Sequence, residues 1–246
     1  MSRANRLLEV NVKNLKHTLA LVSVLALAVA AAAFGFDSPR HSPQGAMPMG
    51  AMGTMGTMGT MGAATVSTSR AEDLRVTLDN LLGEHALLAI WATQAGYSGG
   101  KNFPALAAQL DHNSVAISNA IGSVYGKAAA RQFLDGKNLW RAHIGYFVDY
   151  TKALAGKDKA AQKRAVARLM TYIQVQAAFF AKATGLPKQA LVNDLTAHVL
   201  QLKGQLDAFA AGNYKLSYAL ADGAYQHMFM TGDLLASAIA KQKGLK

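Results

Sequence analysis

LRVTLDNLLGEHALLAIWA, residues 74–92, carries apolar side chains at the three- and four-residue steps that keep them on one face of an α-helix. The residues on that face are Leu74, Leu78, Leu81, His85, Leu88 and Ala92. The segment therefore predicts an amphipathic helix that turns one imidazole toward the interior of the protein.

Three further segments repeat this arrangement around His143, His198 and His227. Their other apolar positions include Leu139, Tyr146, Tyr150 and Leu154, then Leu191, Leu195, Leu202 and Leu206, and finally Leu220, Ala224, Leu234 and Ala238. Because an apolar interior desolvates a polar ring at a cost, each buried imidazole needs a hydrogen-bond partner, a metal ion or another ligand.

The spacing of the histidines indicates an internal repeat. His85 and His143 lie 58 residues apart, His143 and His198 lie 55 apart, and each of these helices runs on to a glycine-containing turn. Residues 70–246 therefore predict an all-α fold, a six-helix antiparallel bundle or short solenoid built from three helical hairpins. Gly136 is expected to kink the long third helix or to divide it.

The first 36 residues predict a cytoplasmic N-region and a transmembrane or signal-anchor helix. Basic residues precede an uncharged run over residues 18–36, which at ~1.5 Å per residue spans about one hydrocarbon thickness. The alternative is a secretory signal cleaved within residues 30–33. Either case exports the rest of the chain, as a single-pass membrane protein with an extracytoplasmic domain or as a secreted or periplasmic protein.

Residues 37–69 predict a disordered linker, rich in Met, Gly and Thr and without helical or strand periodicity. Six of the ten methionines recur here almost every third residue, at Met47, Met49, Met52, Met55, Met58 and Met61. Thioether sulfur is a soft ligand for Cu(I), so the linker is a candidate copper site. The alternative is that the short repeat arose by tandem expansion and that the linker serves only to provide length.

Composition limits the chemistry. The 246-residue chain has no cysteine, which excludes disulfides, thiolate zinc sites and covalently attached haem. Its net charge of +11 suits contact with anionic lipids or cell-wall polymers outside a membrane. An exported protein is not expected to bind nucleic acid, and nothing in the sequence indicates the oligomeric state.

The inward histidines are the candidate structured metal site, for copper ahead of zinc or a non-covalently bound haem. The candidate ligands are His85, His143, His198 and His227, with Met228 and Met230 as additional soft donors. The candidate carboxylates for orienting an imidazole are those of Asp149, Asp207, Asp222 and Asp233. The alternative is that each ring is satisfied by its own hydrogen-bond partner and that no cofactor is bound.

Catalysis is not expected. Residues 70–246 contain only two glutamates, too few for a di-iron bundle, and neither a Gly-x-Ser-x-Gly elbow nor a His-Glu-x-x-His zinc helix occurs. The expected function is therefore metal binding by a tethered, non-catalytic domain. The alternative is a metal-free envelope scaffold that binds a protein partner or an anionic polymer, and a variant of either is pH sensing by the buried histidines.

Three segments resemble a group of uncharacterised exported bacterial all-helical repeat proteins. They are NSVAISNAIGSVYG at residues 113–126, WRAHI at 140–144 and AYQHM at 224–228. The resemblance implies an all-helical, extracytoplasmic domain and carries no activity, ligand or named site. The methionine-rich linker lies outside it.

Overall fold

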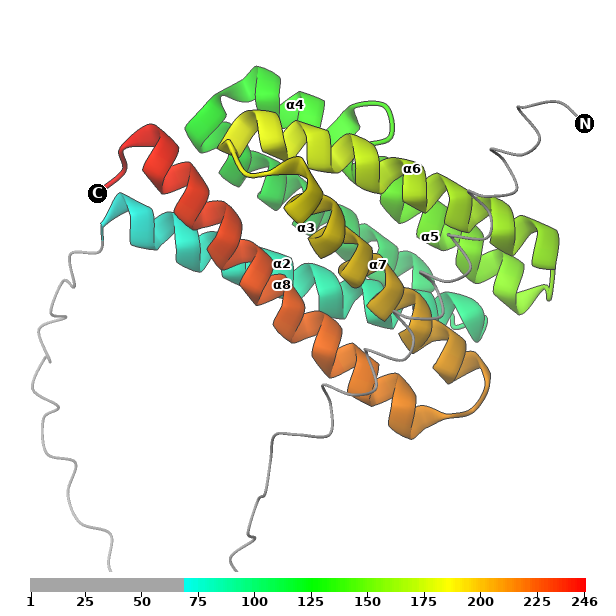
Figure 1. Ribbon diagram of the computed structural model, residues 1–246. Coiled ribbons are helices and arrows are strands. Elements are labelled where there is room, and N and C mark those ends of the chain that lie inside the picture. The colour runs from blue at the N-terminus through cyan, green and yellow to red at the C-terminus, as the bar shows by residue number, and fades with distance from the viewer. Residues whose placement is uncertain (1–68) are drawn as a thin grey trace, which may run out of the picture. The chain divides into compact units, whose positions relative to one another are not determined.

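The computed structural model describes residues 69–246, and every regular element in that range is an α-helix (Figure 1). The helices are α2 (Arg70–Tyr97), α3 (Phe103–Tyr125), α4 (Lys127–Asp135), α5 (Trp140–Ala155), α6 (Lys159–Thr184), α7 (Lys188–Ala210) and α8 (Tyr214–Lys243). The all-α prediction is confirmed for this part of the chain. None of these helices combines the length and the apolar composition needed to cross a membrane.

The expected membrane helix and the methionines of the expected linker lie in residues 1–68, outside the described residues. The expectations about export and about the linker copper site therefore stay predictions.

The three expected hairpins correspond to α2–α3, α5–α6 and α7–α8, whose members pack against each other. The prediction of six helices is corrected to seven, because the third one is divided at Gly136 into α4 and α5. A Cβ at residue 136 would lie 2.4 Å from the carbonyl oxygen of Gln132 and 2.6 Å from Leu139 Cδ1. Only glycine fits this sharp change of direction.

The hairpins form a closed bundle rather than a solenoid. Helix α2 packs against α3, α5, α7 and α8, so the last hairpin returns to the first. Figure 1 shows the red end of α8 beside the cyan start of α2, where the Arg70 amide donates to the Lys246 carbonyl at 2.8 Å. In a solenoid each repeat contacts only its neighbours, so this closure decides between the two predicted architectures.

Two glycines allow α2 and α8 to approach closely. A Cβ at Gly232 of α8 would lie 2.4 Å from Asp79 Oδ1 and 3.0 Å from the Asp79 backbone nitrogen. A Cβ at Gly83 of α2 would lie 2.5 Å from the ring of Phe229. The absence of side chains at these two positions therefore sets how near the two helices lie.

Polar side chains define where several helices begin. Ser69 and Glu72 form a reciprocal capping box at the start of α2, Asp158 accepts from the Ala161 amide at 2.9 Å, and Asn213 accepts from the Leu216 amide at 3.2 Å. At the other end of α6, Gly185 adopts a φ of 74°, which terminates the helix in a conformation that favours glycine.

Candidate metal site in a row of buried histidines

Four helices contribute one imidazole each to a row through the core. His143 of α5, His85 of α2, His198 of α7 and His227 of α8 follow one another, with ring centroids 5.5, 6.1 and 6.5 Å apart. His85, His143 and His198 are only 1%, 2% and 3% exposed, whereas the side chain of His227 is 13% exposed. The row therefore runs from the deep interior toward the surface.

The central place of His85 follows from the position of its helix. Helix α2 packs against α5, α7 and α8, the three helices that carry the other imidazoles. His85 therefore has His143 on one side and His198 on the other. The equal repeat spacing alone does not specify this order.

The rings do not form the expected single site around one ion. Within residues 69–246, no group of three or more His, Cys, Asp or Glu side chains is placed to hold a metal ion together. A tetrahedral zinc site needs four ligands, so the row does not provide one. The arrangement leaves sites between two neighbouring rings.

The inner rings have few hydrogen bonds. Neither Nδ1 nor Nε2 of His85 makes a hydrogen bond of good geometry among the described residues, although the neighbouring Asn113 side chain acts to raise the pKa of this ring, and Nδ1 of His198 likewise has no partner. His143 Nδ1 donates to the carbonyl oxygen of Trp140, one turn earlier in the chain. In a neutral imidazole that bond leaves Nε2 unprotonated, as a metal ligand must be.

Burial keeps the inner rings neutral. Desolvation lowers the pKa of His85 to about 3 and that of His143 to about 3, and the neighbouring imidazole adds to each shift. The pKa of His198 is also lowered well below its usual value, again mainly by desolvation. These rings are therefore in the protonation state that binds metals at neutral pH.

His227 behaves differently, because it has a carboxylate partner. Its Nε2 lies 3.3 Å from Asp194 Oδ1 and 3.1 Å from the Asp194 carbonyl, and the hydrogen bond to the Asp194 side chain raises the pKa of His227. Thr231 donates to the same carboxylate at 3.1 Å. His227, at the outer end of the row, therefore already has a protein partner in Asp194.

Aromatic side chains pack around the two imidazoles at the inner end of the row, those of His143 and His85. Tyr172 stacks on His143 with centroids 4.4 Å apart, and the Trp140 ring lies 4.7 Å from His85 and 4.9 Å from His143. Trp140 Nε1 is fixed in turn by donation to Ser114 Oγ at 3.1 Å. Packing against aromatic rings therefore helps to orient both imidazoles, and His143 is held in addition by its hydrogen bond to the Trp140 carbonyl.

A small cavity of about 30 Å³ adjoins both His85 and His143. Its other lining groups are mostly apolar, such as Leu110, Phe147 and Leu202. The Thr151 hydroxyl, which also lines it, donates to a carbonyl of its own helix at 2.8 Å. The space is enough for one ion or one water molecule.

The remaining candidates lie apart from this cavity. Met228 is buried in α8 and Met230 is exposed at the surface. The aspartates sought as orienting groups pair elsewhere: Asp149 with Arg168, Asp207 with Tyr150 and Lys203, and Asp233 with Arg75. No hydrogen bond or ion pair links Asp222 to any of the four histidines in residues 69–246.

Asp194, which does orient a histidine, was not predicted from the sequence. Its signal was its position one helical turn before His198, on the face that turns toward α8. Gln176 was not predicted either: it is fully buried, and both polar atoms of its side chain lack a partner among the described residues. Only the packing between helices reveals the pairing of Asp194 with His227 and the burial of the Gln176 side chain.

No family model, curated protein or solved structure matches the chain. The chemistry of the site is therefore the basis for proposing a function.

Proposed function

We propose that the helical domain binds one copper ion, as Cu(I), in the cavity between His85 and His143. The observation that carries this proposal is the juxtaposition of that cavity with two neutral imidazoles, one of which has no hydrogen-bond partner for either nitrogen among the described residues. Buried polar groups without a partner are rare in proteins, and a bound ion is one way in which such a group is satisfied.

The geometry suits an ion that accepts two nitrogen ligands. Two imidazole nitrogens at about 2 Å from a metal place their ring centres roughly 6 Å apart. The His143–His85 and His85–His198 separations of 5.5 and 6.1 Å lie on either side of that distance. Cu(I) accepts two imidazoles, whereas zinc requires further ligands.

The surroundings also favour a singly charged ion over a larger cofactor. The cavity walls are mostly apolar, so a divalent ion without carboxylate ligands would be desolvated at a high cost. A porphyrin needs a pocket of several hundred Å³, against about 30 Å³ here. Non-covalent haem is therefore not part of the proposal.

The proposal extends to the rest of the chain. The linker methionines form a second, softer copper site, and the N-terminal apolar segment places the domain outside a membrane or exports it. The domain is non-catalytic. The resemblance to exported bacterial helical proteins supports the location.

Copper titration of the full-length protein tests the histidine site. All six linker methionines, together with His17 and His41, are replaced by leucine, so that these ligands outside the helical domain are removed, and Cu(I) affinity is measured against a chelator under reducing conditions. We expect one equivalent, with two nitrogen ligands in the X-ray absorption spectrum. His85→Leu should abolish binding, and His112→Leu, at an exposed histidine outside the row, should not.

His85→Leu is a suitable variant because it removes a buried polar ring that has no partner, so the fold should survive; thermal melting checks this. His143→Gln provides a second loss-of-binding variant. A protein with the methionine-free linker that binds no Cu(I) would overturn the proposal and leave the metal-free scaffold alternative. Binding that is unchanged in both variants would also overturn it, because copper would then bind elsewhere.

A further inference from the structure

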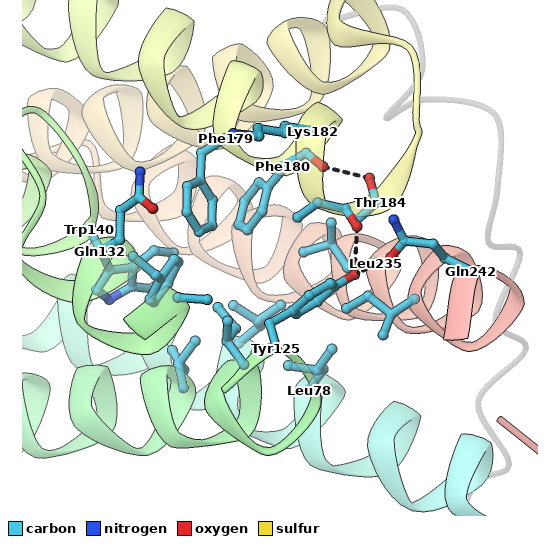
Figure 2. Close-up of a pocket in the computed structure, with 17 residues that line it drawn as sticks. Leu78, Tyr125, Gln132, Trp140, Phe179, Phe180, Lys182, Thr184, Leu235 and Gln242 are labelled. Carbon is cyan, nitrogen blue, oxygen red and sulfur yellow. Dashed lines mark hydrogen bonds between the residues drawn. The ribbon is translucent and has the colours of Figure 1, made fainter. Parts of the chain in front are cut away.

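A second, larger cavity has Trp140 among its lining residues. Its volume is about 280 Å³, and its walls come from six helices: α2, α3, α4, α5, α6 and α8. Side chains that represent these walls are Leu82, Ile117, Phe133, Phe180, Leu235 and Ile239. Figure 2 shows the aromatic rings of Phe179, Phe180, Tyr125 and Trp140 around this space. The interior of the cavity is therefore apolar.

Polar groups gather at the rim, and no carboxylate lines the cavity. Gln132, Lys182 and Gln242 are exposed residues that reach the lining from α4, α6 and α8, so the cavity extends to the surface (Figure 2). Tyr125 fixes one edge, because its hydroxyl lies 2.7 Å from the Ala183 carbonyl and 2.8 Å from Gln242 Oε1. Lys243 adds a second cation, 4.4 Å from the Tyr125 ring centre.

These features define the chemistry of a ligand. The apolar walls exclude a ligand that is polar throughout, while the Lys182 ammonium group, in a lining that contains no carboxylate, favours an anionic head. An apolar cavity of about 150 Å³ holds benzene, so a volume of 280 Å³ suits an alkyl chain of roughly ten carbons.

We propose that this cavity binds a medium-chain fatty acid, with the alkyl chain among the aromatic and aliphatic walls and the carboxylate at Lys182. This site is distinct from the histidine cavity: the two cavities share no lining residue, although the Trp140 ring, which lines the larger one, packs against His85 and His143. It requires neither copper nor any change in the histidine row.

Trp140 provides a direct readout. The chain has two tryptophans, of which Trp91 is 51% exposed and Trp140 is 3% exposed and lines the cavity. In full-length protein carrying Trp91→Phe, all tryptophan fluorescence comes from Trp140. We expect saturable quenching by 10-bromodecanoate, reversed by competing decanoate. Bromine quenches only on close contact, so uptake of the probe by detergent or lipid would not produce this signal.

Two kinds of variant test the two parts of the site. Ala129→Phe and Ala183→Phe each place a ring in the lining and should weaken the binding of bromodecanoate at least tenfold. Lys182→Gln should weaken decanoate several-fold and leave competition by 1-decanol unchanged. Lys163→Gln, at an exposed lysine in the same helix, is the matched control and should behave as the parent.

The absence of quenching, or quenching that survives both filling variants with melting temperatures like the parent's, would overturn the fatty-acid site. Equal binding of decanoate and 1-decanol, unchanged by Lys182→Gln, would overturn the assignment of an anionic head. A cavity filled by another segment of the chain or by a second copy would also give no quenching, and would therefore count against the proposal.

Discussion

At the scale of single residues, the histidines differ in what satisfies them. His143 donates to a backbone carbonyl and stacks on Tyr172, and His227 pairs with Asp194, whereas His85 has no partner for either nitrogen among residues 69–246. Four inward imidazoles that look alike in sequence are therefore not equivalent. The ring with the fewest hydrogen bonds is His85, which lies between His143 and His198.

This difference predicts opposite effects of one substitution in the metal-free protein at pH 7. His85→Leu should leave the free energy of unfolding unchanged or raise it, because it removes a desolvated polar group without a partner. His143→Leu should lower it by about 1 kcal/mol, because a hydrogen bond and a stacked contact are lost. Urea unfolding of both variants measures the effects, and a loss of several kcal/mol in His85→Leu would contradict the assignment.

At the scale of the elements, the contact between α2 and α8 closes the bundle. Gly83 and Gly232 permit this contact, and the start of α2 is joined to the residue Lys246 by the hydrogen bond from the Arg70 amide. Since α2 also carries His85, the position of the row depends on how these helices cross. A glycine in a helix interior usually costs stability relative to alanine, and here the close approach explains its presence.

Gly232→Ala is therefore expected to destabilise the protein by about 1–3 kcal/mol, because its Cβ would lie 3.0 Å from the Asp79 backbone, which cannot move aside as a side-chain end can. Gly145→Ala in α5 is the matched control. Its Cβ would have no neighbour within 4 Å, so the gain in helix propensity should stabilise by about 0.5–1 kcal/mol. Chemical unfolding of the two variants should give opposite signs, and equal effects would contradict the role of Gly232.

At the scale of the whole molecule, the buried histidines link folding to pH. The folded pKa values of His85 and His143 are about 3, whereas an unfolded histidine has a pKa of about 6.5. As pH falls below 6.5, the unfolded chain takes up protons that the folded protein does not, so folding is destabilised. His227 opposes this trend, because its pKa is raised and its pairing with Asp194 is strongest at low pH.

The melting temperature should therefore be steady above pH 6.5 and fall progressively at lower pH. At pH 5 each of the two inner rings should cost about 2 kcal/mol relative to neutral pH. A thermal melt at half-unit steps from pH 7.5 to 4.5 measures this, and His85→Leu should reduce the slope by one ring's share. A melting temperature that stays constant over this range would rule out the linkage.

Local patterns in the sequence were sufficient to predict much of the fold. Apolar spacing predicted the helices and the inward positions of His85, His143 and His198, which are buried. Gly136 predicted a kink or a division of the third helix, and the structure shows the division into α4 and α5. These features depend on contacts within a few residues of each other in the chain, so periodicity and turn residues specify them directly.

Local sequence patterns therefore specify an all-helical repeat in which four helices carry an inward imidazole. The packing of the helices places these rings in one row with His85 between His143 and His198, pairs Asp194 with His227, and forms two separate cavities. Helical periodicity specifies which face of a helix is buried but not its axial offset or crossing angle with a neighbour. Those quantities are set by close packing between segments far apart in the chain, and they decide which buried groups meet.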